Sequence, residues 1–175
     1  MKFKKDSKLQ LVKTLDESLY YWAFKDIQKA AIQGDAKMAG FILGVCFIDA
    51  LSGFYSGLIR KDMKSGSAKR FKNFVKKYLP KYDPELLYGD LRCGLVHSYS
   101  AGEAYVFTDA IKAGKHFEVT STGKIILNLE DFILDLHNAY NNYRKDILEN
   151  FDIFKKAEER FHSIGIMQSL AISKL

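Results

Sequence analysis

The sequence predicts a mainly α-helical protein: one helical domain over residues 1–175, with about five to six helices and a small β insertion at residues 101–128. Apolar residues recur at helical spacing through most of the chain, and this periodicity is the main indicator of helix. Short runs of β-branched and aromatic residues interrupt it between positions 104 and 128. Two prolines, 47% hydrophobic residues and 27% charged residues in a chain of 175 are typical of a single globular domain.

The first two helical segments differ in polarity. Residues 8–33 carry an amphipathic pattern, whereas residues 36–60 are strongly apolar, because Asp49 is the only charge among the 22 residues between Lys37 and Arg60. That length is enough to span a bilayer. A charge at the centre of a span costs about 2.5–3.5 kcal/mol, however, and serines and glycines dilute the apolar run further. We therefore predict a buried core helix and no membrane contact.

A third helix is predicted from about Ser67 to Tyr78, with aromatic residues on one face and lysines on the other. It lies in a basic segment, residues 60–81, which has nine Lys or Arg residues against one acid. Such a segment suits a phosphate backbone, since proteins gain affinity for polyanions largely by neutralising phosphates. A solvated surface is the alternative interpretation. The candidate RNA-binding residues are Arg60, Lys69, Arg70, Lys72, Lys76 and Lys77.

The next helix carries the most informative pair of residues. Asp83 and Pro84 begin it as N-cap and first-turn proline, and Arg92 and His97 follow five positions apart. Arg is a fixed cation that binds phosphate, and His can accept and donate a proton near neutral pH. RNA cleavage by internal attack of a 2′-hydroxyl needs these two abilities and no metal. On an ideal α-helix the two side chains point about 140° apart, so we expect them to meet across two copies of the chain.

The chain changes character after this helix. Three short strands are predicted, and they would form a β-hairpin or a small three-stranded sheet inserted after the motif helix. Their ranges are 104–108, 117–120 and 124–128. Helical periodicity then returns from Leu129 to about Asn150 and from Phe151 to about Leu170.

The stretch from Arg92 to His97 resembles the HEPN superfamily (higher eukaryotes and prokaryotes nucleotide-binding). These small helical domains are marked by an Arg, four to six further residues and a His late in the domain. The resemblance covers roughly residues 10–160 in the order of the helices, and it is specific in the motif helix. It implies a HEPN-like helical bundle that forms a homodimer, with the two motifs meeting at the interface and acting as a metal-independent endoribonuclease. Arg92 and His97 would then be the catalytic residues.

Four further residues would support such a site. Asp49 would orient the catalytic pair from the neighbouring helix, or else form a structural salt bridge that satisfies a buried acid. Ser98 would offer a hydroxyl hydrogen bond, and Tyr99 would stack on a base or line the dimer interface. Cys93 stands where many active members carry Asn or Asp. This departure favours the alternative of a catalytically inactive dimeric module that binds RNA, a nucleotide or a partner protein.

Neither a metal nor another cofactor is expected. Cys46 and Cys93 lie in apolar runs and are expected to be reduced core thiols, while His116, His137 and His162 show no metal-ligand spacing and are expected at the surface. No Walker, Rossmann or zinc-ribbon pattern is present, and the N-terminal residues do not resemble a secretory signal, which predicts a cytoplasmic protein. The expected partners are RNA, a second copy of the chain and, for a toxin or defence role, an antitoxin or other partner protein.

Overall fold

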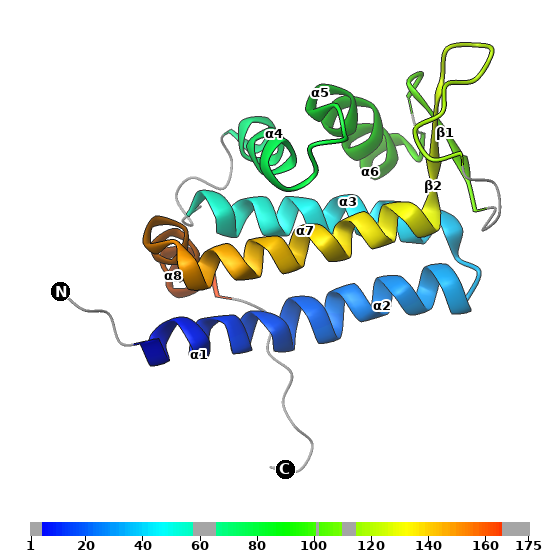
Figure 1. Cartoon of the computed structure of the whole chain (residues 1–175). Helices are drawn as coiled ribbons and strands as arrows, with labels where there is room; N and C mark the ends of the chain where they lie inside the picture. Colours follow the sequence, from blue (N-terminus) through cyan, green and yellow to red (C-terminus); the bar gives the residue numbers. More distant parts are fainter. Residues whose placement is uncertain (1–4, 58–65, 101, 110–114, 166–175) are drawn as a thin grey trace.

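The fold is described from a computed structural model, in which residues 5–57, 66–100, 102–109 and 115–165 are described. Of these residues 75% are helical, in six continuous helices, and two short strands form one sheet (Figure 1). The predicted mainly α class is therefore confirmed. The fold is built from successive helical layers, with the N-terminal helix at one side and the helix that carries Arg92 at the other (Figure 1).

The N-terminal layer is one long helix that includes two π-helical stretches. Its parts are α1 (Lys5–Leu15), η1 (Asp16–Phe24), α2 (Lys25–Gln28) and η2 (Lys29–Gln33). Its buried side chains face α3 (Lys37–Ser56) and α7 (Leu129–Glu149). Gly40 of α3 permits this close packing, because a Cβ there would lie 2.7 Å from the Ala31 Cβ.

The central helix is α3, which contacts α7, α4 (Ser67–Tyr78) and α8 (Phe151–Ile164). Among the described residues α3 is the one helix with the length and apolarity of a membrane span, and 56% of that window is buried. Core helices of soluble proteins have the same length and composition. The packing of α3 agrees with the predicted core helix, and the absence of membrane contact stays a prediction.

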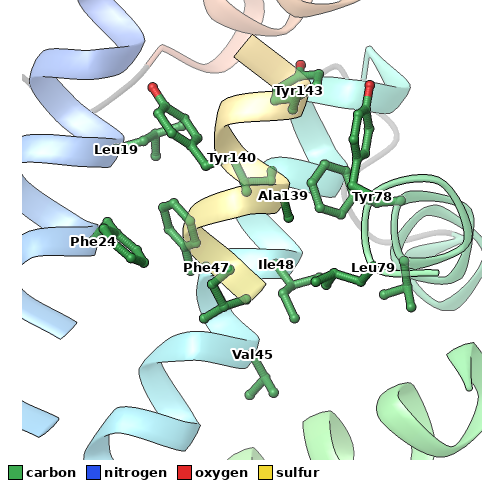
Figure 2. Close-up of a cluster of buried hydrophobic side chains, with 14 of the residues drawn as sticks. Leu19, Phe24, Val45, Phe47, Ile48, Tyr78, Leu79, Ala139, Tyr140 and Tyr143 are labelled. Carbon is green, nitrogen blue, oxygen red and sulfur yellow. The ribbon is translucent and has the colours of Figure 1, made fainter. Parts of the chain in front are cut away.

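The hydrophobic core lies between the N-terminal helix, α3, α4 and α7 (Figure 2). Its labelled members are Leu19, Phe24, Val45, Phe47, Ile48, Tyr78, Leu79, Ala139, Tyr140 and Tyr143. Fully burying one large apolar side chain of this kind stabilises the fold by about 1.5–3 kcal/mol. The hydroxyls of Tyr140 and Tyr78 donate to carboxylates, Asp16 Oδ1 and Asp146 Oδ2, at 2.8 Å each. These bonds satisfy polar atoms that the core would otherwise leave without a partner.

The motif helix is continuous from Pro84 to Ser98 but changes its hydrogen-bond pattern along the way. Its parts are α5 (Pro84–Leu86), η4 (Leu87–Cys93), which is π-helical, and α6 (Gly94–Ser98). Asp83 Oδ1 accepts from the backbone N–H groups of Glu85 at 2.8 Å and Leu86 at 3.0 Å, which confirms the predicted N-cap. The predicted bounds of α4 are also confirmed.

The β insertion agrees with its prediction in part. Strands β1 (Tyr105–Thr108) and β2 (Ile125–Asn128) pair in parallel as a two-stranded sheet, which the sequence does not predict. The predicted antiparallel return of segment 117–120 onto β2 is present in its backbone hydrogen bonds, because the Phe117 N–H donates to the Ile126 carbonyl and the Ile126 N–H donates to the Glu118 carbonyl, each at 2.8 Å. Segment 117–120 contributes an isolated antiparallel bridge from Val119 to Ile125. Phe117 has a φ of +69°, and this left-handed conformation interrupts the extended backbone that a strand requires.

Two asparagines begin the last two helices. Asn128 Oδ1 accepts from the N–H of Glu130 at 3.0 Å and starts α7, and Asn150 Oδ1 accepts from the N–H of Asp152 at 3.0 Å and starts α8. The predicted continuation of the last helix to about Leu170 lies outside the described residues. Because α8 packs across the end of α3, its inner face reaches the same region as the motif helix.

Candidate functional site

Arg92 on η4 faces Asp49 on α3. Asp49 Oδ2 accepts from Arg92 Nη2 at 2.7 Å and from Arg92 Nε at 3.2 Å. The Asp49 and Arg92 side chains are 29% and 20% exposed, so Asp49 lies in a surface recess and is not the buried acid that the sequence predicts. Partial burial alone would lower the pKa of Arg92, but the hydrogen bond and charge of Asp49 raise it instead. Asp49 therefore fixes the guanidinium in one orientation.

His97 lies beside the same guanidinium, with Nε2 3.4 Å from Arg92 Nη1. The expectation that one helix keeps the two groups apart is therefore wrong. The π-helical stretch η4 ends at Cys93, and His97 lies on the α-helical turn α6 that follows it. The long Arg92 side chain spans the separation that the helical backbone leaves between the two positions. Because Arg can only donate, this contact is a hydrogen bond only while Nε2 carries no proton.

Tyr88 supports Arg92 from the preceding turn of the motif helix. The Arg92 Cζ lies 5.6 Å from the centroid of the Tyr88 ring, within the range of a cation–π interaction. The Tyr88 hydroxyl is also 3.0 Å from Ser67 Oγ at the start of α4. Arg92 is thus held by a carboxylate from α3 and by a ring that is tied to α4.

A pocket of about 330 Å3 opens beside this arrangement, between α3, α4, η4 and α8. Its lining residues are Cys46, Asp49, Ala50, Gly53, Ser67, Arg70, Arg92 and Arg160. Three guanidinium groups and one carboxylate therefore face the same space. Guanidinium groups bind phosphates and carboxylates through paired, charge-assisted hydrogen bonds, so the lining suits an anion.

Arg160 of α8 is the pocket residue that the sequence does not identify. Its Cζ lies 5.4 Å from the centroid of the Phe54 ring, and burial and then the nearby Arg70 lower its pKa from the usual value. A local signal does exist. Arg160 follows the buried Ile153 by seven positions and the buried Ala157 by three, so it falls on the core-facing stripe of α8.

The predicted RNA-binding residues on α4 differ in their contacts. Of those that the structure describes, Arg70 alone lines the pocket. Two of the lysines form ion pairs, Lys72 with Glu85 and Lys77 with Asp146 at 2.7 Å. Lys69 and Lys76 are exposed away from the pocket lining, and Arg60 lies outside the described residues.

The remaining predicted site residues surround the pair without lining this pocket. Cys93 is half-buried, and Ser98 and Tyr99 are exposed at the end of α6, where Tyr99 adopts a left-handed φ of +54°. Cys46 is an exposed residue of the pocket wall and not the core thiol that the sequence predicts. Partial removal from water and then the Asp49 carboxylate raise the pKa of Cys46, which favours the unreactive thiol form.

Outside the pocket, two of the histidines expected at the surface instead have structural roles. His116 is largely buried, with Nε2 3.2 Å from the Tyr82 hydroxyl and 3.4 Å from Asp135 Oδ2, and its Nδ1 accepts the backbone N–H of Asn128 at 3.1 Å. His137 packs against aromatic rings of the N-terminal helix. Within the described part of the chain, no group of three or more His, Cys, Asp or Glu residues is placed to hold a metal ion.

Comparisons with protein-family models, with curated proteins and with solved structures find no match to this chain. Functional conclusions therefore rest on the geometry of the pocket and of the Arg92–His97 pair. The resemblance to HEPN domains is carried by that pair and contributes to a proposal about function.

Proposed function

We propose that the chain is a metal-independent endoribonuclease of the HEPN type that acts as a homodimer. The observation that carries the proposal is the 3.4 Å contact between Arg92 Nη1 and His97 Nε2 at the edge of a basic pocket. A fixed cation and a proton-transfer group at one place are what cleavage by an internal 2′-hydroxyl requires. Asp49 supports the proposal because it holds the cation in position.

The chemistry proceeds in one displacement. His97 takes the proton of the 2′-hydroxyl, and the freed oxygen attacks the adjacent phosphorus. The bond from phosphorus to the 5′-oxygen breaks, and the leaving oxygen receives a proton from the His97 of a second copy. Arg92 neutralises the charge that grows on the non-bridging oxygens. The products are a 2′,3′-cyclic phosphate and a 5′-hydroxyl.

The end of α6 offers a surface for the second copy. Val96 is 40% exposed and Tyr99 is 71% exposed, and His97 lies between them in the sequence. Aromatic residues are enriched at protein interfaces, and the buried centre of an interface is more apolar than its rim. A twofold axis close to His97 would bring both motifs into one groove.

Cleavage of RNA in EDTA tests the proposal. The parent chain is expected to release fragments with 2′,3′-cyclic phosphate ends, and Arg92→Ala and His97→Ala are expected to lose this activity. His162→Ala is the matched control, because His162 is an exposed imidazole on α8 and should leave cleavage unchanged. Equal cleavage by the parent and the two motif variants would identify a contaminating nuclease.

Mixing the two inactive variants tests the shared groove. A heterodimer of Arg92→Ala and His97→Ala retains one guanidinium and one imidazole in the common cleft. With that imidazole as the base and water as the proton donor in place of the second imidazole, the mixture should recover a small part of the parent activity. If each chain carries its own independent site, mixing restores nothing. Light scattering of the mixture checks that dimers have formed.

A catalytically inactive dimeric module is the second candidate, and two observations favour it. Asp49 already accepts two hydrogen bonds from Arg92, and Cys93 replaces the polar residue found in many active HEPN domains. In this case Arg92 and its neighbours build the interface, and the partner is RNA, a nucleotide or another protein such as an antitoxin. Arg92→Ala should then shift the dimer towards monomer in light scattering, and the parent should cut no RNA.

A further inference from the structure

The pocket contains more positive charge than the Arg92–His97 motif supplies. Arg70 comes from α4 and Arg160 from α8, and neither belongs to the motif helix. With Arg92 and Asp49, the charged groups that line the pocket are three guanidiniums and one carboxylate, a formal charge of +2. This charge is concentrated around about 330 Å3 of space within a single copy of the chain.

Two of the three guanidiniums are held in place before any ligand binds. Arg92 is fixed by Asp49 and lies near the Tyr88 ring. Arg160 lies near the Phe54 ring and beside Gly53, where a Cβ would be in ordinary van der Waals contact with Arg160 Nε at 3.5 Å. Groups that are already ordered lose less conformational entropy on binding, which increases affinity for a ligand of matching shape.

The environment of Arg160 indicates that an anion would be stabilised there. After burial, the charge of Arg70 is the cause that lowers the pKa of Arg160, so the two cations lie close enough to repel each other. An anion between them would add two attractive interactions, which offset this repulsion. Ser67 adds a hydroxyl at the same wall, which can donate to an anionic oxygen.

We propose that this pocket binds a phosphate monoester. At neutral pH a phosphate monoester carries a charge of about −1.5 to −2, which matches the lining better than the single charge of an internal phosphodiester. The volume is at the lower end of the range for small-ligand sites and suits a phosphate with its sugar. The source of the monoester is either a free sugar phosphate or the 5′ end of a nucleic-acid strand. The site needs neither the dimer nor His97, although it shares Arg92 with the proposed nuclease.

Calorimetric titration of the full chain with ribose 5-phosphate tests the proposal, with ribose as the control ligand. Ribose 5-phosphate should bind and ribose should not, and inorganic phosphate should compete. Arg70→Gln and Arg160→Gln should each weaken binding at least about tenfold, since each removes charge-assisted hydrogen bonds. The matched controls are Lys69→Gln on α4 and Lys155→Gln on α8, which remove exposed charges outside the pocket lining and should change the affinity less than about twofold.

A second titration distinguishes the two sources. Deoxypentanucleotides with a 5′-phosphate and with a 5′-hydroxyl differ only in the monoester, and neither has the 2′-hydroxyl that the proposed cleavage needs. Preference for the 5′-phosphate strand over ribose 5-phosphate identifies a strand end, and the reverse preference identifies a free sugar phosphate. Equal binding of the two strands combined with no binding of ribose 5-phosphate would overturn the proposal.

Two further variants separate this proposal from misfolding and from the nuclease. Arg160→Lys keeps the charge and the aliphatic stem but loses the planar fork, so it should bind ribose 5-phosphate with an affinity between those of the parent and Arg160→Gln. His97→Ala should bind it as the parent does. A chain that binds the monoester but cuts no RNA contradicts only the nuclease. A chain that cuts RNA but distinguishes neither ribose 5-phosphate from ribose nor the two strands contradicts only the monoester site.

Discussion

The ion pair between Asp49 and Arg92 predicts a measurable loss of stability when its charge is removed. Asp49→Asn keeps the size of the side chain but removes its negative charge. The two hydrogen bonds from Arg92, at 2.7 Å and 3.2 Å, both end on Asp49 Oδ2, and in the variant a neutral amide oxygen accepts them in place of a carboxylate oxygen. Hydrogen bonds to charged groups contribute about 1.5–3 kcal/mol when buried, whereas fully exposed pairs contribute about 0–1 kcal/mol.

The exposures of 29% for Asp49 and 20% for Arg92 place this pair between those limits. We expect Asp49→Asn to lower the free energy of unfolding by about 1–2 kcal/mol. At about 2–4 °C per kcal/mol for a chain of this size, the midpoint of thermal unfolding should fall by about 2–8 °C. Urea unfolding followed by circular dichroism measures the free energy, and calorimetry measures the midpoint.

The matched control is Asp35→Asn, because the Asp35 side chain is 84% exposed in its ion pair with Lys37. It should change the free energy of unfolding by less than about 0.5 kcal/mol. A double-mutant cycle with Arg92→Gln should give a coupling energy of about 1–2 kcal/mol between Asp49 and Arg92. Equal effects of Asp49→Asn and Asp35→Asn, or a coupling energy near zero, would refute the view that Asp49 holds the guanidinium.

Two further predictions concern groups outside the pocket. Tyr140→Phe removes a 2.8 Å hydrogen bond to the Asp16 carboxylate and should lower the free energy of unfolding by about 1–2 kcal/mol. Tyr143→Phe should be neutral or stabilising, because the buried Tyr143 hydroxyl has no hydrogen-bond partner among the described residues. Similar losses of stability for the two variants in urea unfolding would contradict this. Burial alone would raise the pKa of Asp135, but hydrogen bonds from His116 and Tyr82 hold it below the ordinary 3.8. The carboxylate of Asp135 therefore stabilises the fold above that pH, and the stabilisation is lost as the pH falls through the lowered value. Asp135→Asn should consequently lose less stability than the parent between about pH 5 and pH 2 in urea titrations, and an equal or greater loss would argue against this role.

Features of the fold that are set by residues close together in the sequence can be predicted from the sequence alone. The Asp83 cap and the bounds of α4 are set by local hydrogen bonds and by a clear amphipathic pattern, so sequence periodicity predicts them to the residue. The pairing of the strands is set by segments far apart in the chain. No local pattern shows that β2 takes β1 as a parallel neighbour, or that Phe117 adopts a left-handed conformation.

In the candidate site, too, some residues can be identified from the sequence and others only from contacts between distant segments. Arg92 and His97 are identified by their residue types and spacing, and Asp49 by its isolation in an apolar helix. Arg160 becomes a site residue only because α8 packs across the end of α3, and this tertiary contact leaves a weak trace in the sequence. For His116 the sequence predicts a surface position, because the residue lies in an apparent turn. In the structure His116 is largely buried and contacts Tyr82 and Asp135.

The geometry of the pair is set at the junction of two helical stretches. Arg92 lies in the last turn of η4, which is π-helical, and His97 lies in α6, which is α-helical, yet Arg92 Nη1 and His97 Nε2 are 3.4 Å apart. Gly94, between them, contributes a second constraint. A Cβ at Gly94 would lie 2.4 Å from the Ser100 carbonyl oxygen, so glycine lets the chain fold back over the helix directly after His97. The α-helical turn that carries His97 is therefore bounded by η4 before it and by the close return of the chain after it. A helical wheel gives the directions of the Cβ atoms alone, and it contains neither the length of the Arg92 side chain nor this return of the chain.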